Sequence, residues 1–191
     1  NPSVSLQDDG SGLISWTQLD NNNALQVLKC EYLVGSWECP ESVDENLSVN
    51  GTHAHLPLTA QDGSGNALIA WTQDSEPDDS ASQYVFFAEK RNGTWSHPST
   101  LDDHVSFPAE GASSLRLAMA SEGDAVVLWH QGLGERHGDI YKIEYRDGSW
   151  ISPASESDYL NYSYANASAV DPQVAMNDLG ETLVVWAQYI A

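Results

Sequence analysis

The sequence predicts an all-β chain built from repeated four-stranded antiparallel units, and two recurring landmarks carry this prediction. The first is Trp-x-Gln at the end of an apolar run, which occurs four times at intervals of about 55–58 residues. The second is Gly-Ser-Trp or Gly-Thr-Trp followed by Pro three residues after the Trp, and it occurs three times. Together they include all seven tryptophans. Four short strands in a repeat of this length are typical of a β-propeller blade.

Each unit divides into strands a, b, c and d in chain order. Strand a is a short alternating run such as Leu58-Thr59-Ala60, and a turn rich in Gly and Asp joins it to strand b, which carries Trp-x-Gln. Strand c is expected at 24–33, 83–91 and 139–146. A two-residue turn leads to strand d with its Trp, and pairs such as Asn92-Gly93 are strong hairpin signals. No segment shows a sustained helical period.

We expect one β-propeller domain, or a fragment of one, over residues 1–191. Three full blades are predicted at about 2–40, 56–98 and 115–153, followed by a half blade at 172–191. A propeller ring needs about four blades to close, and an unpaired strand b leaves an open sheet edge. The sequence therefore favours an oligomer or a part of a longer chain over an isolated open monomer.

The Trp and Gln of each Trp-x-Gln motif share one face of strand b, because side chains alternate along a strand. The four pairs are Trp16 and Gln18, Trp71 and Gln73, Trp129 and Gln131, and Trp186 and Gln188. The Trp suits packing between blades, and a buried amide must be hydrogen-bonded. We interpret the Gln as an architectural residue that bonds the backbone of the adjacent blade. A ring of Gln side chains that binds a ligand is the functional alternative.

The two cysteines face each other when residues are counted outward from the Val34-Gly35 turn. Pairs alternate from a hydrogen-bonded pair beside a two-residue turn, which makes Cys30 and Cys39 a non-hydrogen-bonded pair with close Cα atoms. Their spacing falls within the range of a disulfide. A disulfide predicts an oxidising compartment and hence a secreted protein, extracellular or periplasmic. Two reduced thiols are the alternative.

The charge of the chain speaks against two classes of partner. The formal net charge is −21, with seven Lys and Arg residues. Nucleic acid needs a basic footprint, and anionic lipid repels an acidic surface. No apolar run is long enough to cross a membrane as a helix. An acidic surface suits cations, cationic partners or solubility alone.

The c–d hairpins resemble a shortened Asp box, the repeat of sialidases and related propellers. The family pattern is S-x-D-x-G-x-T-W, and the matching pieces are 92–95 and 147–150, which lack the leading Ser and one residue before the Gly. The chain also resembles secreted bacterial repeat proteins, as in the P-x-V-x5-G-x5-W-x-Q run from Pro172 to Gln188. The resemblance implies a sialidase-like propeller fold. Sialidases use three Arg and a Tyr–Glu pair, and no such set is apparent among the four arginines.

A ligand site is expected on the face that holds the b–c and d–a loops, because long loops tend to carry function. The b–c loops are 19–23, 74–82 and 132–138, and the d–a loops are 41–54, 99–113 and 154–171. They hold more than half of the acidic residues and one basic residue. The candidate ligand-binding residues are Arg136, His137, His104, Tyr159, Asp78 and Asp79.

Two patterns raise the question of a metal ion. The 62–66 stretch has oxygen side chains at positions 1, 3 and 5, like the start of a calcium loop, but lacks the later acidic ligand, which favours a plain turn. His53 and His55 would need Asp44 or Glu45 to complete a site. We therefore predict no cofactor, with calcium as the alternative. No Ser-His-Asp order, nucleophile elbow or phosphate loop is present, so no catalytic residue is assigned.

The sequence favours a non-catalytic, secreted β-propeller segment that binds a carbohydrate or a protein through its acidic loop face. One alternative is a fragment of a sialidase-like glycoside hydrolase. The other is a purely structural or assembly module.

Overall fold

The computed structural model describes residues 1–191 except 34, 78–81, 109–110, 133–137, 163–166 and 191. It is all-β, as predicted: the described strands form three four-stranded antiparallel sheets and one two-stranded sheet. These are the three blades and the half blade. Two 3-10 turns, Val43–Glu45 and Leu101–Asp103, lie in d–a loops. Within the described ranges no helix is long and apolar enough to span a membrane.

The strands follow one another in each sheet in the order a, b, c, d. Blade one contains β1 (Ser3–Leu6), β2 (Gly12–Leu19), β3 (Leu25–Leu33) and β4 (Ser36–Glu38). Blade two contains β5 (Ala54–Gln61), β6 (Ala67–Asp74), β7 (Gln83–Arg91) and β8 (Thr94–Ser96). Blade three contains β9 (Ala112–Met119), β10 (Ala125–Gly132), β11 (Gly138–Arg146) and β12 (Ser149–Ile151). The half blade contains β13 (Ala167–Met176) and β14 (Thr182–Ile190).

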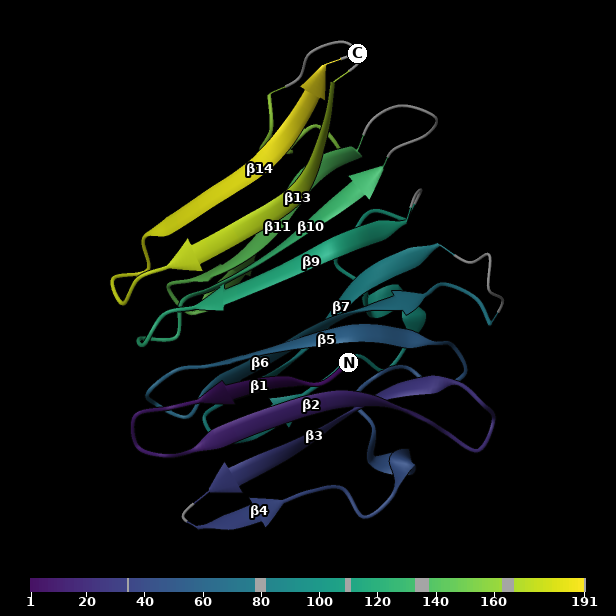
Figure 1. Cartoon of the computed structure of the whole chain (residues 1–191), viewed down its shortest axis with the longest axis vertical. Helices are drawn as coiled ribbons and strands as arrows, with labels where there is room; N and C mark the ends of the chain where they lie inside the picture. Colours follow the sequence, from purple (N-terminus) through teal and green to yellow (C-terminus); the bar gives the residue numbers. More distant parts are fainter. Residues whose placement is uncertain (34, 78–81, 109–110, 133–137, 163–166, 191) are drawn as a thin grey trace.

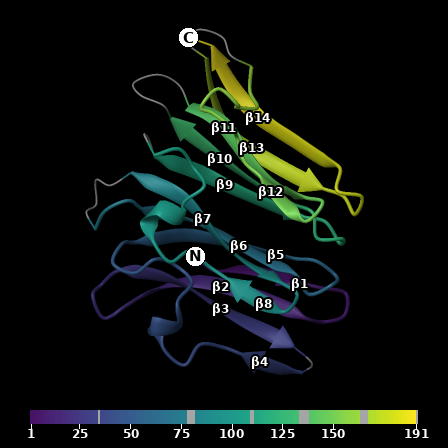
Figure 2. The same ribbon diagram turned by 180° about the vertical axis from the view of Figure 1, so that it is seen from behind.

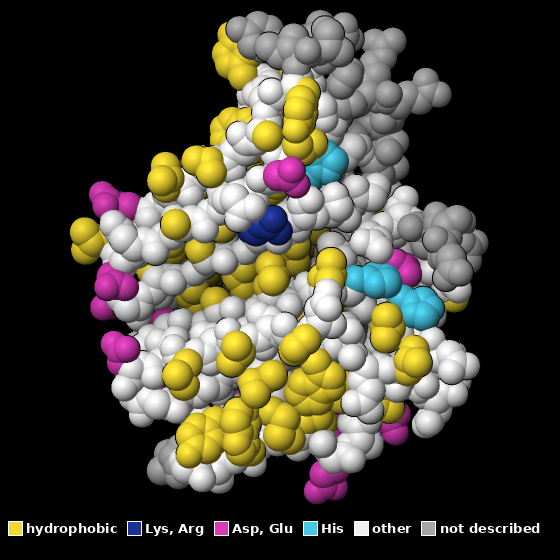
Figure 3. All heavy atoms as spheres, in the orientation of Figure 1, with side chains coloured by type: hydrophobic (Ala, Val, Ile, Leu, Met, Phe, Trp, Pro, Cys, Tyr) yellow, Lys and Arg dark blue, Asp and Glu magenta, His cyan; other side chains and the backbone are white. Residues whose placement is uncertain are grey.

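The blades are stacked so that their a strands lie side by side (Figure 1), with β1 beside β5, β5 beside β9 and β9 beside β13. We name the surface that these four strands form the strand-a wall. The outer strands β4, β8 and β12 are seen from the opposite side (Figure 2). Apolar side chains are frequent on the strand-a wall, and acidic side chains lie mostly at its margins (Figure 3).

The Trp of the Trp-x-Gln motif packs between blades, as the sequence indicates. Trp71 is fully buried in a cluster with Leu13 and Val27 of blade one, and Trp129 is fully buried against Leu68 of blade two. Blades two and three thus each bury a large aromatic against the preceding sheet, which ties these neighbouring blades together by apolar burial.

The Gln of the motif bonds a target that differs from the one predicted. Gln73 Oε1 accepts hydrogen bonds from Trp71 Nε1 (3.1 Å) and Val49 N (3.2 Å), while its Nε2 donates to Val49 O (2.5 Å). Val49 lies in the d–a loop that enters blade two, not in a strand of blade one. Gln131 and Gln188 bond Phe107 O and Tyr162 O in the corresponding loops. The amide therefore fixes the incoming loop to its own blade.

A second contact between blades joins strand c of one blade to strand d of the next. Glu31 of β3 is buried, and its Oε1 accepts a hydrogen bond from Trp95 Nε1 of β8 at 2.6 Å. Lys29 and Lys90 form ion pairs with the same carboxylate. In the next pair of blades Trp150 Nε1 donates to Glu89 Oε2 at 3.1 Å. We call each of these hydrogen bonds between a Glu of strand c and a Trp of the next strand d a lock; the first joins Glu31 to Trp95 and the second joins Glu89 to Trp150. The two locks occupy equivalent positions of the repeat.

The first c–d hairpin contains the predicted disulfide. Glu31 pairs with Glu38 and Tyr32 with Trp37, which is the register counted from the turn. Cys30 and Cys39 are bonded, with Cα atoms 4.3 Å apart. The bridge ties the three-residue strand β4, which is exposed throughout, to the buried strand β3.

Candidate functional site

Strand a of the second, third and fourth sheets begins earlier than predicted. Each of these strands contains a β-bulge, and the predicted blades began at that bulge. In each bulge two residues oppose the Trp of the Trp-x-Gln motif, and the first has a φ of 49°, 52° or 53°. The bulges are Leu56-Pro57, Ser114-Leu115 and Asp171-Pro172. A non-glycine residue in this left-handed region costs roughly 1 kcal/mol. Because a bulge redirects the neighbouring side chains, these positions shape the strand-a wall.

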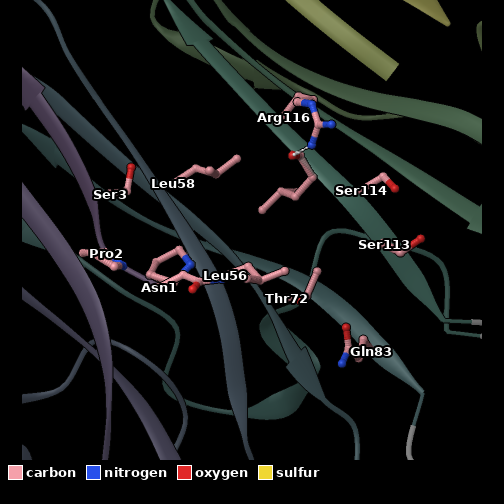
Figure 4. A pocket seen from close by; sticks show the side chains of 12 residues that line it. Asn1, Pro2, Ser3, Leu56, Leu58, Thr72, Gln83, Ser113, Ser114 and Arg116 are labelled. Carbon is pink, nitrogen blue, oxygen red and sulfur yellow. Dashed lines mark hydrogen bonds between the residues drawn. The ribbon is translucent and has the colours of Figure 1, made fainter. Parts of the chain in front are cut away.

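A groove of about 330 Å³ lies on the strand-a wall between β5 and β9 (Figure 4). Two of the bulges face it from opposite sides. Residues 56–58 give it an apolar side, and Ser113, Ser114 and Arg116 give it a polar side. Thr72 and Gln83 lie at one end. Hydroxyl, amide and guanidinium groups therefore surround an apolar surface.

The groove lies near the end of the strand-a wall from which the b–c and d–a loops extend. Thr72 is near the end of β6, Gln83 begins β7, and β5 and β9 run from this same end, because strands in an antiparallel blade alternate in direction. Yet none of the described residues that line the groove is Asp or Glu. The described lining of the groove therefore differs in charge from the acidic loops near it.

Arg116 has the one charged side chain among the described residues that line this groove. The five other basic residues that the structure describes each form an ion pair with a carboxylate; they are Lys29, Lys90, Arg91, Lys142 and Arg146. Arg116 has no acidic partner among the described residues and donates one hydrogen bond, from Nη1 to Leu115 O at 2.8 Å. A guanidinium carries five N–H groups, so Arg116 retains donors for a bound molecule.

His130 lies beside the groove and holds one of its hydroxyl groups. His130 Nδ1 is 3.1 Å from Ser113 Oγ. A Cβ at position 138 would overlap His130 Nε2, so the close approach of the ring requires Gly138. Burial lowers the pKa of His130, although the nearby Asp139 and Asp171 act in the opposite direction. The imidazole is therefore neutral near pH 7 and can orient the Ser113 hydroxyl as donor or acceptor.

Of the residues predicted to bind a ligand, the structure describes His104 and Tyr159, and neither lines this groove. Arg136, His137, Asp78 and Asp79 lie outside the described residues. The ring of His104 packs 4.4 Å from that of Tyr84, and its Nδ1 donates to Ser106 O at 2.7 Å. Tyr159 is partly buried and packs edge-on against Tyr141.

The two candidate metal patterns make local contacts. Asp62 is buried, and its Oδ1 accepts hydrogen bonds from Ser64 N and Asn66 N at 2.9 and 2.8 Å, as in a capped turn. His55 Nε2 lies 3.0 Å from Asp74 Oδ1, and His53 Nδ1 accepts a hydrogen bond from Leu25 N. Across the described ranges no group of three or more metal-ligating side chains is found.

The groove was not predicted from the sequence, although the sequence contains a signal for its bulges. Proline within a strand marks an edge or a bulge, and Pro57 and Pro172 each precede the following Trp by 14 residues. Pro2 precedes Trp16 by the same interval, with Asn1 at the position of Leu56. The residue before the Pro differs between the repeats, whereas its distance in sequence from the Trp is constant. A repeated scaffold thus carries a different side chain at the same place in each blade.

Comparisons with known proteins agree with the fold. No protein-family model matches the sequence, and no curated protein matches it. The structure is similar to a polysaccharide lyase of family PL25, an ulvan lyase bound to GlcA(1-4)Rha3S, with a TM-score of 0.64 and 7% identity over 98% of this chain and 48% of that one. This likeness shows fold alone.

Two further structures are enzymes bound to arabinobiose. One is the GH93 α-L-arabinofuranosidase of Fusarium graminearum, with a TM-score of 0.55, 15% identity and coverage of 97% of this chain and 55% of that one. The other is the α-L-arabinanase of Penicillium chrysogenum, with a TM-score of 0.56, 15% identity and coverage of 98% and 56%. The chain spans about half the length of these structures. The fold is that of β-propeller blades, and it is shared with carbohydrate-active enzymes.

Proposed function

We propose that this chain is a non-catalytic β-propeller segment that binds a carbohydrate in the groove between β5 and β9. The observation that carries the proposal is the lining of that groove, in which hydroxyl, amide and guanidinium groups face an apolar side. A sugar ring presents apolar C–H surface and polar hydroxyls, and small-ligand sites combine apolar walls with a few polar groups in a comparable volume. Structural neighbours solved with bound saccharides support the proposal.

Binding is favoured over hydrolysis by the absence of carboxylates from the described lining of the groove. Most glycosidases use a pair of Asp or Glu side chains on either side of the glycosidic bond. A sialidase-like glycoside hydrolase therefore remains the second candidate function, with its carboxylates supplied by residues outside this groove. A protein ligand is less well matched, because the groove has the size of a small-molecule site.

The test is a binding screen of neutral, uronate-containing and sulfated oligosaccharides, followed by calorimetry on those that bind. We expect the acidic members to bind most tightly, because Arg116 offers charge-assisted hydrogen bonds that act locally against the net charge of −21. Gln83→Trp fills the end of the groove and should weaken binding at least tenfold. Ser64→Trp adds the same side chain to an exposed turn on the opposite face and should leave binding unchanged. Absence of glycan binding, or clear hydrolysis of a bound glycan, would contradict the proposal.

We further propose that the protein acts outside the cytoplasm and that its open flanks are covered, in an oligomer or in a longer chain that completes the propeller domain. The Cys30–Cys39 disulfide supports an oxidising compartment, as the predicted relation to secreted sialidase-like repeat proteins would require. Exposed Val4, Leu6 and Trp37 on blade one, and Leu183 on the half blade, support covered flanks.

The mass of the 191-residue chain in solution tests the oligomeric form of this proposal. Light scattering after size exclusion should give a multiple of 20.8 kDa. A stable monomer of 20.8 kDa would contradict self-association.

A further inference from the structure

A third site, at Glu144, has the same position in the repeat as the two locks between strand c and strand d, but no described tryptophan occupies it. Glu31, Glu89 and Glu144 occupy the same register position, opposite Glu38, Ser96 and Ile151 of their hairpins. Glu31 accepts a hydrogen bond from Trp95 of the next blade, and Glu89 from Trp150. The described part of the half blade has strands a and b, so no described strand d faces Glu144.

The Glu144 site matches the first lock more closely than the second. In the first lock Lys29, two residues before Glu31, pairs with that carboxylate and lies 4.8 Å from the centroid of the Trp95 ring. Lys142 stands two residues before Glu144 and forms an ion pair with it. In the second lock the corresponding residue is Phe87, whose ring packs on Trp150. The Lys-x-Glu pattern therefore occurs at both sites. In the first lock its Lys places a cation beside the indole ring and its Glu accepts the indole N–H.

The space for that ring is present. A cavity of about 210 Å³ lies between β11 and β14, lined by Lys142, Glu144 and Leu160 on one side and by Thr182, Val184 and Trp186 on the other. An apolar cavity of about 150 Å³ is sufficient to hold benzene. The Lys142 side chain is 38% exposed, against 21% for Lys29 beneath Trp95. The cation is less covered where the indole is missing.

The carboxylate of Glu144 can accept the additional hydrogen bond. Arg146 Nε bonds Glu144 Oε2 at 3.3 Å, and Lys142 pairs with Oε1. In the first lock Glu31 Oε1 accepts from Lys29 and Trp95 together, both at 2.6 Å. A carboxylate has about four lone-pair sites, so Glu144 Oε1 retains capacity for an indole N–H in the same way.

We propose that the cavity between β11 and β14 binds the tryptophan of a partner β-hairpin whose outer strand carries Gly-Ser-Trp or Gly-Thr-Trp. The indole N–H donates to Glu144, the ring lies over Lys142, and the inner strand of the hairpin pairs with the free edge of β14, which is at the margin of the molecule (Figure 2). The backbone groups of that edge supply a template for pairing. The inference is independent of the carbohydrate groove, which lies on the strand-a wall.

The probe is a synthetic peptide spanning residues 25–40, closed by the Cys30–Cys39 disulfide, which holds this hairpin in register with Trp37 on its outer strand. Its matched control is the same peptide with Trp37→Ala. Binding to the full chain is measured by calorimetry or by NMR titration, with the fold of each protein checked by circular dichroism.

We expect the peptide to bind the wild-type chain, and Trp37→Ala in the peptide or Glu144→Gln in the protein to weaken binding about tenfold or more, because a hydrogen bond to a charged group is lost in each case. Glu122→Gln removes an exposed carboxylate from the turn before β10 and should leave the affinity unchanged. The proposal is overturned if the wild-type chain does not bind the peptide, or if either the Trp37→Ala peptide or the Glu144→Gln protein binds as tightly as the unmodified pair.

Discussion

Trp71→Ala is expected to lower the free energy of unfolding by about 3–5 kcal/mol, the range observed when a buried aromatic is truncated to alanine. Trp71 is fully buried between blades one and two, and its Nε1 donates to Gln73 Oε1 at 3.1 Å. Its removal leaves a cavity and withdraws one of the groups that hold the Gln73 amide in contact with Val49. Urea denaturation followed by circular dichroism measures the loss.

Trp16→Ala is the matched control, because Trp16 holds the same position in the repeat. Its ring is partly exposed in the structure, and its Nε1 lies 3.4 Å from Gln18 Oε1 at the protein surface. For the isolated chain the expected loss is smaller than at Trp71, because part of the Trp16 ring is in contact with water. An equal loss at Trp16 and Trp71 would show that the flank of blade one is covered in solution.

Glu31→Gln is expected to lower the free energy of unfolding by about 3 kcal/mol, because it removes the anion from a buried ion pair and leaves the ammonium groups of Lys29 and Lys90 without their shared counter-charge. The Glu31 and Lys90 side chains are 6% and 13% exposed, so water cannot replace the lost partner. Glu38→Gln removes the same charge from an exposed residue directly opposite in the hairpin and should change stability little. Similar losses for the two variants would refute the lock between blades one and two.

The same carboxylate should make stability depend on pH. Burial by itself raises the pKa of Glu31, but the hydrogen bonds from Lys29, Lys90 and Trp95 outweigh it and hold the pKa below the usual value of 4.5. A carboxyl group with a lowered pKa in the folded state stabilises the protein above its unfolded-state pKa. This contribution is lost as the pH falls below about 4.5 through the folded-state pKa.

The pH dependence is measured as the difference in unfolding free energy between the wild type and Glu31→Gln from pH 7 to pH 3. The difference should be largest at neutral pH and shrink as Glu31 becomes protonated. Other carboxyl groups with lowered pKa values, such as Asp9 and Asp103, which accept hydrogen bonds from their own turns, are present in both proteins and cancel. A difference that stays constant down to pH 3 would contradict the assignment.

Much of the candidate site escaped the sequence because its parts are assembled by contacts between blades. Leu56 and Ser114 are 58 residues apart and become opposite sides of one groove through the packing of β5 beside β9. Proline within a strand indicated a bulge, but not which strands would meet. The hydrogen-bond partner of the Gln73 amide was predicted wrongly for the same reason. Alternation along β6 shows which face Gln73 is on, but not that the 39–53 loop passes beside it.

The sequence predicted the four-stranded blades and the Cys30–Cys39 pairing, although not the true starts of strand a, because the paired register of a hairpin follows local rules. Alternation along a strand and a two-residue turn fix the hairpin register, and that register places Cys30 opposite Cys39. The groove beside Arg116, the locks at Glu31 and Glu89, and the open site at Glu144 became visible only in the folded chain. These features depend on how one twisted sheet is rotated against the next, which brings together side chains about 60 residues apart through packing rather than through hydrogen bonds along a strand.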